Sequence, residues 1–203
     1  MQARGYQWET AAHSEAHGYL LPALHRIMDT WPGERRCFDL GCGNGSVAAA
    51  VATHGWRVTG VDPSDDGVAR ARETYPELEI VQGEAGPELV ERFGRFPVVY
   101  SLEVVEHVYA PRVFAKTLYS LTEPGGLAIV STPYHSYWKN LALAVTGRLD
   151  AHFTALWDNG HIKFWSIDTL GTLLREAGFR HVRFERVGRL APLAKSMIAI
   201  ATP

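Results

Sequence analysis

A glycine-rich segment follows the first apolar run of the chain and has the residue types of a ligand-binding loop. It reads Asp39-Leu-Gly-Cys-Gly-Asn-Gly45, with glycine at every second position from Gly41 to Gly45. Glycine has no Cβ atom and tolerates positive φ, so the backbone of such a loop can approach a ligand closely before a helix begins. The segment therefore predicts a ligand site, with Cys42 packed inside it or facing the ligand.

The residues around the glycines indicate which kind of ligand the loop can bind. A dinucleotide-binding fingerprint spaces its glycines as GxGxxG to receive a pyrophosphate, whereas Ser46 stands where the third glycine would follow Gly41 and Gly43. The carboxylate of Asp39, just ahead of the loop, would repel a pyrophosphate. It suits a ligand that carries ammonium and sulfonium groups.

Polar residues also end the next three strands that the sequence predicts. Asp62-Pro63 ends the second strand, Gly83-Glu84-Ala85 the third and Ser101-Leu102-Glu103 the fourth. Open parallel sheets bind ligands in the crevice at the carboxyl ends of their strands, so these segments are expected to face the same crevice. In that place Asp62 can accept hydrogen bonds from both hydroxyls of a ribose.

The positions of these residues depend on an alternation of strands and helices. Apolar runs, and the glycine, proline and polar residues that separate them, predict a series of strands and helices. The strands are expected at 35–40, 57–61, 79–82, 98–101 and 127–132, and the helices at 11–30, 46–54, 65–75, 87–93 and 111–121. Ser64 is expected to cap the third of these helices. Strands that are apolar on both faces and alternate with helices indicate an α/β fold, a parallel sheet covered by helices on each side.

The C-terminal part departs from this alternation. A helix is expected at 167–177, and the runs HVRFERV and SMIAIAT predict two more strands. Their connection of about ten residues is too short for a helical crossover, so an antiparallel hairpin should close one edge of a seven-stranded sheet. Residues 134–166 are expected to form an irregular, aromatic-rich insertion that serves as a lid or substrate region, or that packs its aromatic rings together.

Composition excludes several classes of protein. The chain has 203 residues, of which 46% are hydrophobic, and a formal net charge of −2, which is typical of a single globular domain and gives no basic surface for nucleic acid. Its apolar runs fall short of the roughly 20 residues of a membrane-spanning helix, and its N-terminus lacks the apolar core of a secretory signal. Two cysteines, Cys37 and Cys42, fit a reducing cytoplasm.

The motifs together resemble those of the class I S-adenosylmethionine-dependent methyltransferases over nearly the whole chain. The matching segments are FDLGCGNG, VTGVDPS, VQGEA, VVYSLEVVEHV and EPGGLAIVSTP, in the order and spacing of that family. The resemblance implies a Rossmann-like sheet of three layers with a terminal hairpin. It implies that Asp39, Gly41 and Gly43 hold the methionine part of the cofactor, that Asp62 holds the ribose, that Glu84 and Ala85 hold the adenine, and that Ser101 and Leu102 form the floor near the sulfonium.

Within that family, SLEVVEHV followed by HIKFWS is most similar to the ubiquinone-biosynthesis O-methyltransferases. Some of these use a divalent cation, and the matching positions are Glu103, Glu106 and His107, which could bind a metal that holds a hydroxyl oxygen of the substrate. The alternative is an acidic helix start with a solvated pair. His161 is a candidate base for a hydroxyl proton, with His107, His135 and His152 as competitors.

The resemblance favours O-methylation of a small, hydroxylated aromatic or hydrophobic acceptor. N-, S- or C-methylation is the first alternative, and a nicotinamide-dependent oxidoreductase or a non-catalytic module that binds S-adenosylmethionine are alternatives of other classes. In relatives the first helical region folds over the cofactor. The corresponding residues here are 1–33, which are expected to form a helical cap, so Trp8 and His17 are candidates to contact the cofactor's carboxylate. The identity of the acceptor, the atom methylated and the oligomeric state stay open.

Overall fold

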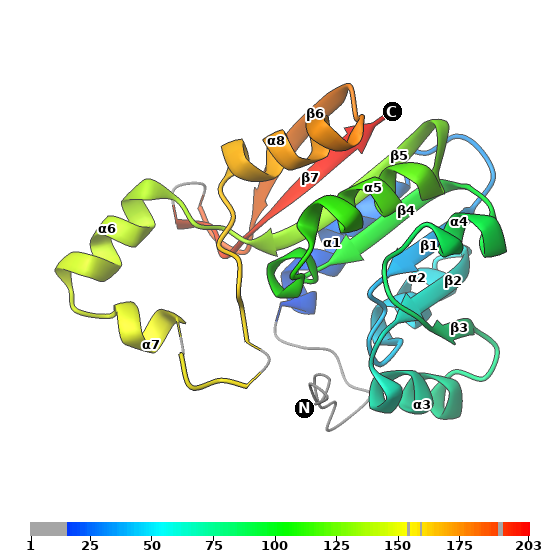
Figure 1. The fold of residues 1–203 in the computed structure, drawn as a ribbon, viewed down its shortest axis with the longest axis horizontal. Coiled ribbons are helices and arrows are strands. Elements are labelled where there is room, and N and C mark those ends of the chain that lie inside the picture. The colour runs from blue at the N-terminus through cyan, green and yellow to red at the C-terminus, as the bar shows by residue number, and fades with distance from the viewer. Residues whose placement is uncertain (1–15, 154, 159, 191–192) are drawn as a thin grey trace.

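A computed structural model describes residues 16–153, 155–158, 160–190 and 193–203. One seven-stranded sheet with the order β3-β2-β1-β4-β5-β7-β6 runs through its centre (Figure 1). The strands are β1 (Arg36–Leu40), β2 (Arg57–Asp62), β3 (Glu79–Gln82), β4 (Phe96–Leu102), β5 (Thr122–Pro133), β6 (His181–Val187) and β7 (Ser196–Thr202). The first five strands pair in parallel, and β7 lies antiparallel to both β5 and β6. The predicted Rossmann-like sheet with a terminal hairpin is confirmed.

Helices cover both faces of the sheet. The helices α1 (His17–Met28), α2 (Ser46–Thr53) and α3 (Asp65–Thr74) pack on one face, and α4 (Glu88–Phe93), α5 (Pro111–Leu121) and α8 (Ile167–Ala177) pack on the other. The predicted cap of α3 is present, because the Ser64 side chain accepts a hydrogen bond from the Gly67 amide. The first helix begins at His17 after a turn at Ala16, and the earlier part of its expected range, together with Trp8, lies outside the described residues.

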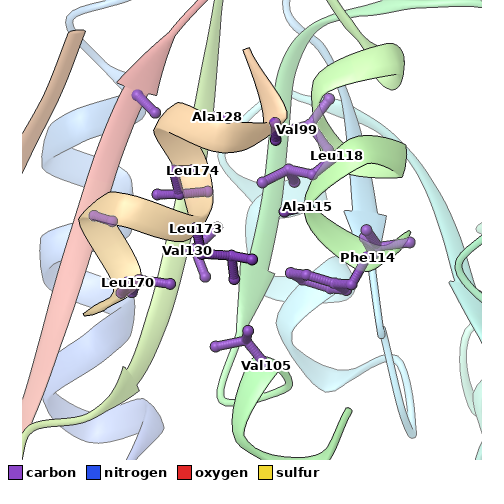
Figure 2. Packing of buried hydrophobic residues seen from close by; sticks show 14 of the residues in the cluster. Val99, Val105, Phe114, Ala115, Leu118, Ala128, Val130, Leu170, Leu173 and Leu174 are labelled. Carbon is purple, nitrogen blue, oxygen red and sulfur yellow. The ribbon is translucent and has the colours of Figure 1, made fainter. Parts of the chain in front are cut away.

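The two cores follow from the alternation of side chains along the central strands. Val99, Ala128 and Val130 contribute to the core under α5 and α8, whereas Tyr100 and Ile129 contribute to the core under α1 and α2. Figure 2 shows the first of these cores, where Phe114, Ala115 and Leu118 from α5 and Leu170, Leu173 and Leu174 from α8 converge on the sheet. This packing fixes the strand ends that carry the site.

Two strands are longer than the sequence predicts. β4 begins at Phe96 and includes Pro97, and β5 begins at Thr122 and runs through Pro124, Gly125 and Gly126, which precede the strand predicted at 127–132. Phe96 pairs with Thr122, and the register between β4 and β5 then shifts before Val98. Proline lacks an amide hydrogen, and such an irregularity is one of the places where a sheet accepts it.

The insertion at 134–166 contains helices, so the expectation of an irregular segment was wrong in part. It forms α6 (Tyr137–Val145) and α7 (Leu149–Phe153), which extend away from the sheet in Figure 1. The Ser136 side chain caps α6 by accepting a hydrogen bond from the Lys139 amide at 3.2 Å. Trp138 is 67% exposed and Val145 79% exposed, whereas Trp165 is buried in the core. Among the described residues, no helix is long and apolar enough to cross a membrane.

Candidate functional site

The glycine loop joins β1 to α2 in a conformation that requires glycine. Gly41, Gly43 and Gly45 have φ values of 93°, 52° and 76°. A Cβ atom on Gly41 would lie 2.5 Å from a methyl carbon of Val104, which belongs to the segment after β4. The loop is therefore shaped by a close approach between two strand ends as well as by its left-handed backbone.

We expect Gly41→Ala to destabilise the protein by about 3 kcal/mol, the sum of a left-handed alanine and an overpacked contact with Val104. Gly55→Ala is the matched control, since Gly55 has a φ of 82° but no atom within 4 Å of an added Cβ. This control should cost only about 1 kcal/mol, from the backbone alone. Urea unfolding measures both values. Equal costs in the two variants would contradict the role given to the Val104 contact.

Asp39 lies at the end of β1 as an almost fully buried carboxyl group, 2% exposed. Burial raises its pKa to about 8, the Asp62 carboxylate raises it further, and the neighbouring Tyr100 hydroxyl partly opposes this rise. Its Oδ2 atom has no hydrogen-bond partner. A buried carboxyl oxygen of this kind is well suited to a cationic donor on a ligand.

A small hollow opens beside Asp39 and is lined from several elements. Its lining residues are His17, Asp39, Gly41, Cys42, Asn44, Ser46, Val47 and Leu102. His17 of α1 thus lines the same hollow as Asp39 and the glycine loop, and its contact with a cofactor stays a prediction. Asn44 and Ser46 were not predicted as site residues. The Asn44 side chain accepts a hydrogen bond from the Ser46 amide, and the signal that could have identified both is the start of a helix after a glycine loop.

Asp62 ends β2 and ties the second strand to the glycine loop. Its two carboxylate oxygens accept hydrogen bonds from the Gly43 and Ser64 amides, each at 2.8 Å. Burial raises the pKa of Asp62, and these two amides oppose the rise. The carboxylate is therefore held in one orientation at the crevice, and its contact with a ribose stays a prediction.

The other predicted cofactor residues lie on the same edge of the sheet. Glu84 and Pro63 are exposed and Ala85 is half-buried, and the end of β3 is bonded to β2 through the Gly83 amide and the Asp62 carbonyl, 3.1 Å apart. Ser101 is fully buried and donates its hydroxyl to the Leu40 carbonyl at 2.5 Å, so it positions the end of β1. The adenine contacts of Glu84 and Ala85 stay predictions.

Glu103 follows β4 in a strained conformation. Its φ of 55° is positive, which is unique among the non-glycine residues that the structure describes. Its amide donates to the Ser131 hydroxyl at 3.0 Å, and that hydroxyl donates to the Glu103 carboxylate at 2.7 Å. Burial raises the pKa of Glu103 to about 7, and the hydroxyls of Ser131 and Ser196 oppose the rise. The strain is thus balanced by a local hydrogen-bond network.

A carboxyl group and two imidazoles meet beyond Glu103. Glu106, His107 and His161 each place one ligand-type atom within 4.8 Å of the others, and Nε2 of His161 lies 4.0 Å from the Glu106 carboxylate. Glu106 is 1% exposed, and burial together with the Glu103 charge raises its pKa well above the usual range. The sequence predicted Glu103, Glu106 and His107 as the metal set; the structure groups His161 with the last two.

The segment at 160–165 is held against the short 3-10 helix Val105–His107 by backbone contacts. The Glu106 carbonyl accepts hydrogen bonds from the Ile162 and Lys163 amides at 2.9 and 3.0 Å. The Trp165 indole donates to the Val105 carbonyl at 3.2 Å. These bonds bring His161 to its place beside His107, with ring centroids 4.9 Å apart, although the two residues are distant in sequence.

The sequence that builds this site matches a known protein family. Residues 12–183 match the model described as a methyltransferase domain. The chain belongs to the class I S-adenosylmethionine-dependent methyltransferases. The nicotinamide-dependent alternative was therefore wrong, whereas the roles of the glycine loop and Asp62 in holding the cofactor stay predictions.

Curated relatives of this methyltransferase carry the name ubiquinone biosynthesis O-methyltransferase. The protein of Caulobacter sp. (strain K31) is 42% identical over 116 residues, which are 55% of this chain and 46% of the relative. That of Ruegeria pomeroyi is 34% identical over 154 residues, 72% of this chain and 60% of the relative. The chain thus matches about half the length of these relatives.

Solved structures of low sequence identity share the fold of this methyltransferase. A SAM-dependent methyltransferase from Archaeoglobus fulgidus superposes with a TM-score of 0.67 at 18% identity, covering 91% of this chain and 93% of the other. The magnesium protoporphyrin IX methyltransferase of Synechocystis PCC 6803 with bound SAH gives 0.64 at 20% identity, with coverages of 90% and 80%. S-adenosylmethionine is the cofactor of this family.

Proposed function

We propose that this protein transfers a methyl group from S-adenosylmethionine to a hydroxyl oxygen of a small aromatic or hydrophobic acceptor. The observation that carries the proposal is the group of Glu106, His107 and His161 on the edge of the sheet that holds the glycine loop and Asp62. A methyl donor alone would not need a buried carboxyl beside two imidazoles. The name of the curated relatives supports an oxygen nucleophile.

S-adenosylmethionine, when bound, supplies a methyl group on a sulfonium and leaves as S-adenosylhomocysteine. The work of the chain is to align the acceptor oxygen with that methyl group and to exclude water, a positioning effect that can supply about 7–11 kcal/mol of the barrier. As the new carbon–oxygen bond forms and the carbon–sulfur bond breaks, the hydroxyl proton must leave the acceptor. We propose that residues 134–166 cover the acceptor during this step.

His161 is the proposed base for that proton. Burial, His107 and His152 lower its pKa to about 4, so its ring is neutral and can accept a proton at physiological pH. Its side chain is 29% exposed, which leaves it accessible from the crevice. His107 is the second candidate, but its Nδ1 atom lies 3.2 Å from the Gly160 carbonyl and is engaged in holding that segment.

A divalent cation is the alternative role for the same side chains. The two oxygens of the buried Glu106 carboxyl have no hydrogen-bond partner, so this donor set of one carboxylate and two imidazoles fits a transition metal. Glu106, His107 and His161 would hold it, and the ion would bind the acceptor oxygen and lower its pKa. Glu103, which the sequence placed in this set, instead accepts hydrogen bonds from Ser131 and Ser196.

We expect His161→Ala to lower turnover at least about 100-fold, since a positioned base contributes that much or more. The affinity for S-adenosylhomocysteine should not change, because the glycine loop is intact. Label transfer from S-adenosylmethionine to a panel of hydroxylated aromatics measures turnover, and His181→Ala, an exposed histidine on β6, is the matched control.

Dialysis of the wild-type protein against a strong chelator then separates the two roles of His161. Turnover that survives dialysis assigns His161 as base. Turnover that disappears and returns with added divalent cation assigns it as a ligand. A His161→Ala variant of wild-type activity would contradict both, and a chain that binds the nucleoside but methylates nothing in the panel would favour the non-catalytic module.

A further inference from the structure

A cavity of about 320 Å³ opens at the amino ends of β1, β2 and β3, beside the last residues of α4. Asp39 and Asp62 lie toward the carboxyl ends of β1 and β2, so the cavity is on the opposite edge of the sheet from the cofactor crevice. The helix α4 has six residues, of which Leu89 is buried, and it leaves this part of the sheet uncovered. The volume is in the range of pockets that hold small molecules.

The strands place charged residues here on the face that elsewhere builds an apolar core. Side chains alternate along a strand, so Arg36 shares a face with Phe38, and Arg57 shares one with Val61. Phe38 and Val61 belong to the core under α5 and α8. Arg36 and Arg57 are paired between β1 and β2. Two like charges on neighbouring strands repel each other, so this arrangement needs negative partners.

Arg36 forms the fixed part of the cavity wall. Its guanidinium donates to a Glu123 oxygen and to the Arg95 carbonyl, each at 2.9 Å. The same guanidinium lies over the ring of Phe96, with its carbon 4.5 Å from the ring centroid. Its Nε atom lies 3.5 Å from a Glu34 oxygen. The charge of Arg36 is therefore matched within the protein, and its main contribution to the cavity is a rigid wall.

Arg57 and Arg92 keep donors that the protein does not use. Arg57 is 73% exposed and donates through one nitrogen, at 3.0 Å, to Glu34, which also pairs with Arg36. The Arg92 guanidinium lies over the ring of Phe93 at 4.8 Å and forms no salt bridge with any residue that the structure describes. A guanidinium presents a fork of donors that matches the oxygens of a phosphate or carboxylate.

Glu79 supplies a negative charge to the wall of the same cavity. Its Oε2 atom accepts a hydrogen bond of 2.8 Å from the hydroxyl of Thr59, which is buried in β2. This bond holds the carboxylate beside the arginines, where it reduces their attraction for an anion. The attraction is therefore modest, and removal of the Glu79 charge should increase it.

We propose that Arg36, Arg57 and Arg92 form a second ligand site, which binds a small molecule with two or more negatively charged oxygens, such as a phosphate ester or a polycarboxylate. Arg57 and Arg92 donate to the anion, and Arg36 forms the wall behind it. The inference does not depend on the proposed function. Because the site lies on the other edge of the sheet, its ligand and S-adenosylmethionine bind at the same time.

Isothermal titration of the full chain tests the site with inorganic pyrophosphate and citrate as probes. The protein is saturated with S-adenosylhomocysteine so that the cofactor crevice is occupied, and both titrations are made at the same low ionic strength, because salt screens exposed charges. We expect saturable binding. Tighter binding of pyrophosphate identifies a phosphate ligand, and tighter binding of citrate identifies a carboxylate ligand.

Arg57→Gln and Arg92→Gln should each weaken the binding of the tighter probe at least about tenfold, because each variant loses a charge-assisted hydrogen bond. The matched control is Arg180→Gln, which removes the same charge from an exposed arginine directly before β6. This control should bind the probe like the wild type. All three variants should keep their affinity for S-adenosylhomocysteine, which shows that they are folded.

Glu79→Gln should tighten the binding of the probe about threefold or more, because it removes a repelling charge and keeps an oxygen that can accept from Thr59. Glu73→Gln, which removes an exposed carboxylate from α3, is the control and should have no effect. A gain of affinity cannot come from damage to the fold. This variant therefore keeps the test valid if an arginine variant is unstable.

Two results would overturn the second site. The first is the absence of saturable binding of both probes to the wild type. The second is binding that Arg57→Gln and Arg92→Gln leave unchanged, or that Arg180→Gln weakens as much as they do, since the probe would then respond to net charge alone. Neither result bears on the proposed methyl transfer, which uses the other edge of the sheet.

Discussion

Replacing Asp62 by alanine is expected to weaken the binding of S-adenosylhomocysteine at least about 100-fold. Hydrogen bonds to a charged acceptor contribute about 1.5–3 kcal/mol each, and the variant loses two of them to the ribose. It also removes the acceptor of the Gly43 and Ser64 amides, so the glycine loop loses a support. Isothermal titration with the nucleoside measures the change.

Two further variants separate the ribose contact from the loop support. Asp62→Asn keeps the size of the side chain and one acceptor oxygen, so it should lose less affinity than the alanine variant. Asp66→Ala removes an exposed acid on α3 that pairs with Arg70 and should bind like the wild type. An Asp62→Ala protein that is folded and binds within threefold of the wild type would exclude Asp62 from the ribose site.

The ligand-free protein is expected to lose stability as the pH rises from about 6.5 to about 8.5. The pKa of Asp39 is raised from 3.8 to about 8 in the folded state, so within this range the folded chain holds a proton that the unfolded chain has released. Stability that depends on this proton is present at low pH and is lost as the pH rises through the folded pKa. At 1.36 kcal/mol per pH unit, Asp39 alone accounts for about 2 kcal/mol.

Other groups set the limits of this pH window. Glu103, with a pKa of about 7, acts in the same direction as Asp39. His135 and His161 have pKa values lowered from 6.5 to about 4, so they add stability as the pH rises through that lower range and have no further effect above it. The loss should therefore become visible only above about pH 6.5.

Urea unfolding at about pH 6.5 and about pH 8.5 checks this result. The test variant is Asp39→Asn, and Asp168→Asn, which replaces an exposed carboxylate, is the matched control. The Asp39 variant should lose part of the pH dependence, because Glu103 and Glu106 titrate in the same direction, whereas the Asp168 variant should keep all of it. In the wild type, binding of S-adenosylhomocysteine at pH 7 should release a proton, because its ammonium group favours the ionised Asp39. A pH dependence that is unchanged in Asp39→Asn would refute the raised pKa.

The position of the glycine loop, Asp39 and Asp62 on one edge of the sheet was predictable from the sequence because these residues are defined by local geometry. Gly41 and Gly43 are needed by a backbone with positive φ, and Asp62 directly ends a strand. In a parallel sheet the carboxyl ends of neighbouring strands share one edge, so knowing which segments are strands already places Asp39 and Asp62 together. Long helices such as α5 and α8 were predicted within the same limits because their apolar periodicity is strong.

The acceptor side could not be predicted in the same way, because its contacts join segments that are distant in sequence and share no periodic pattern. His161 reaches Glu106 through hydrogen bonds of the Ile162 and Lys163 amides, and His135 meets His152 only because α6 and α7 turn the chain back. The alanines and leucines of α6 favour a helix, but the aromatic residues of the segment led to the prediction of an irregular insertion.

The sequence by itself determined the family, the order of strands and helices, and the residues of the glycine loop, because each depends on short-range pattern and backbone geometry. Only the tertiary structure decided that His161 rather than Glu103 joins Glu106 and His107, and that the buried ring of His135 lies beside the half-buried ring of His152. Burial and the approach of distant segments set the charge state and partners of an ionisable side chain, and neither can be inferred from its position along the chain.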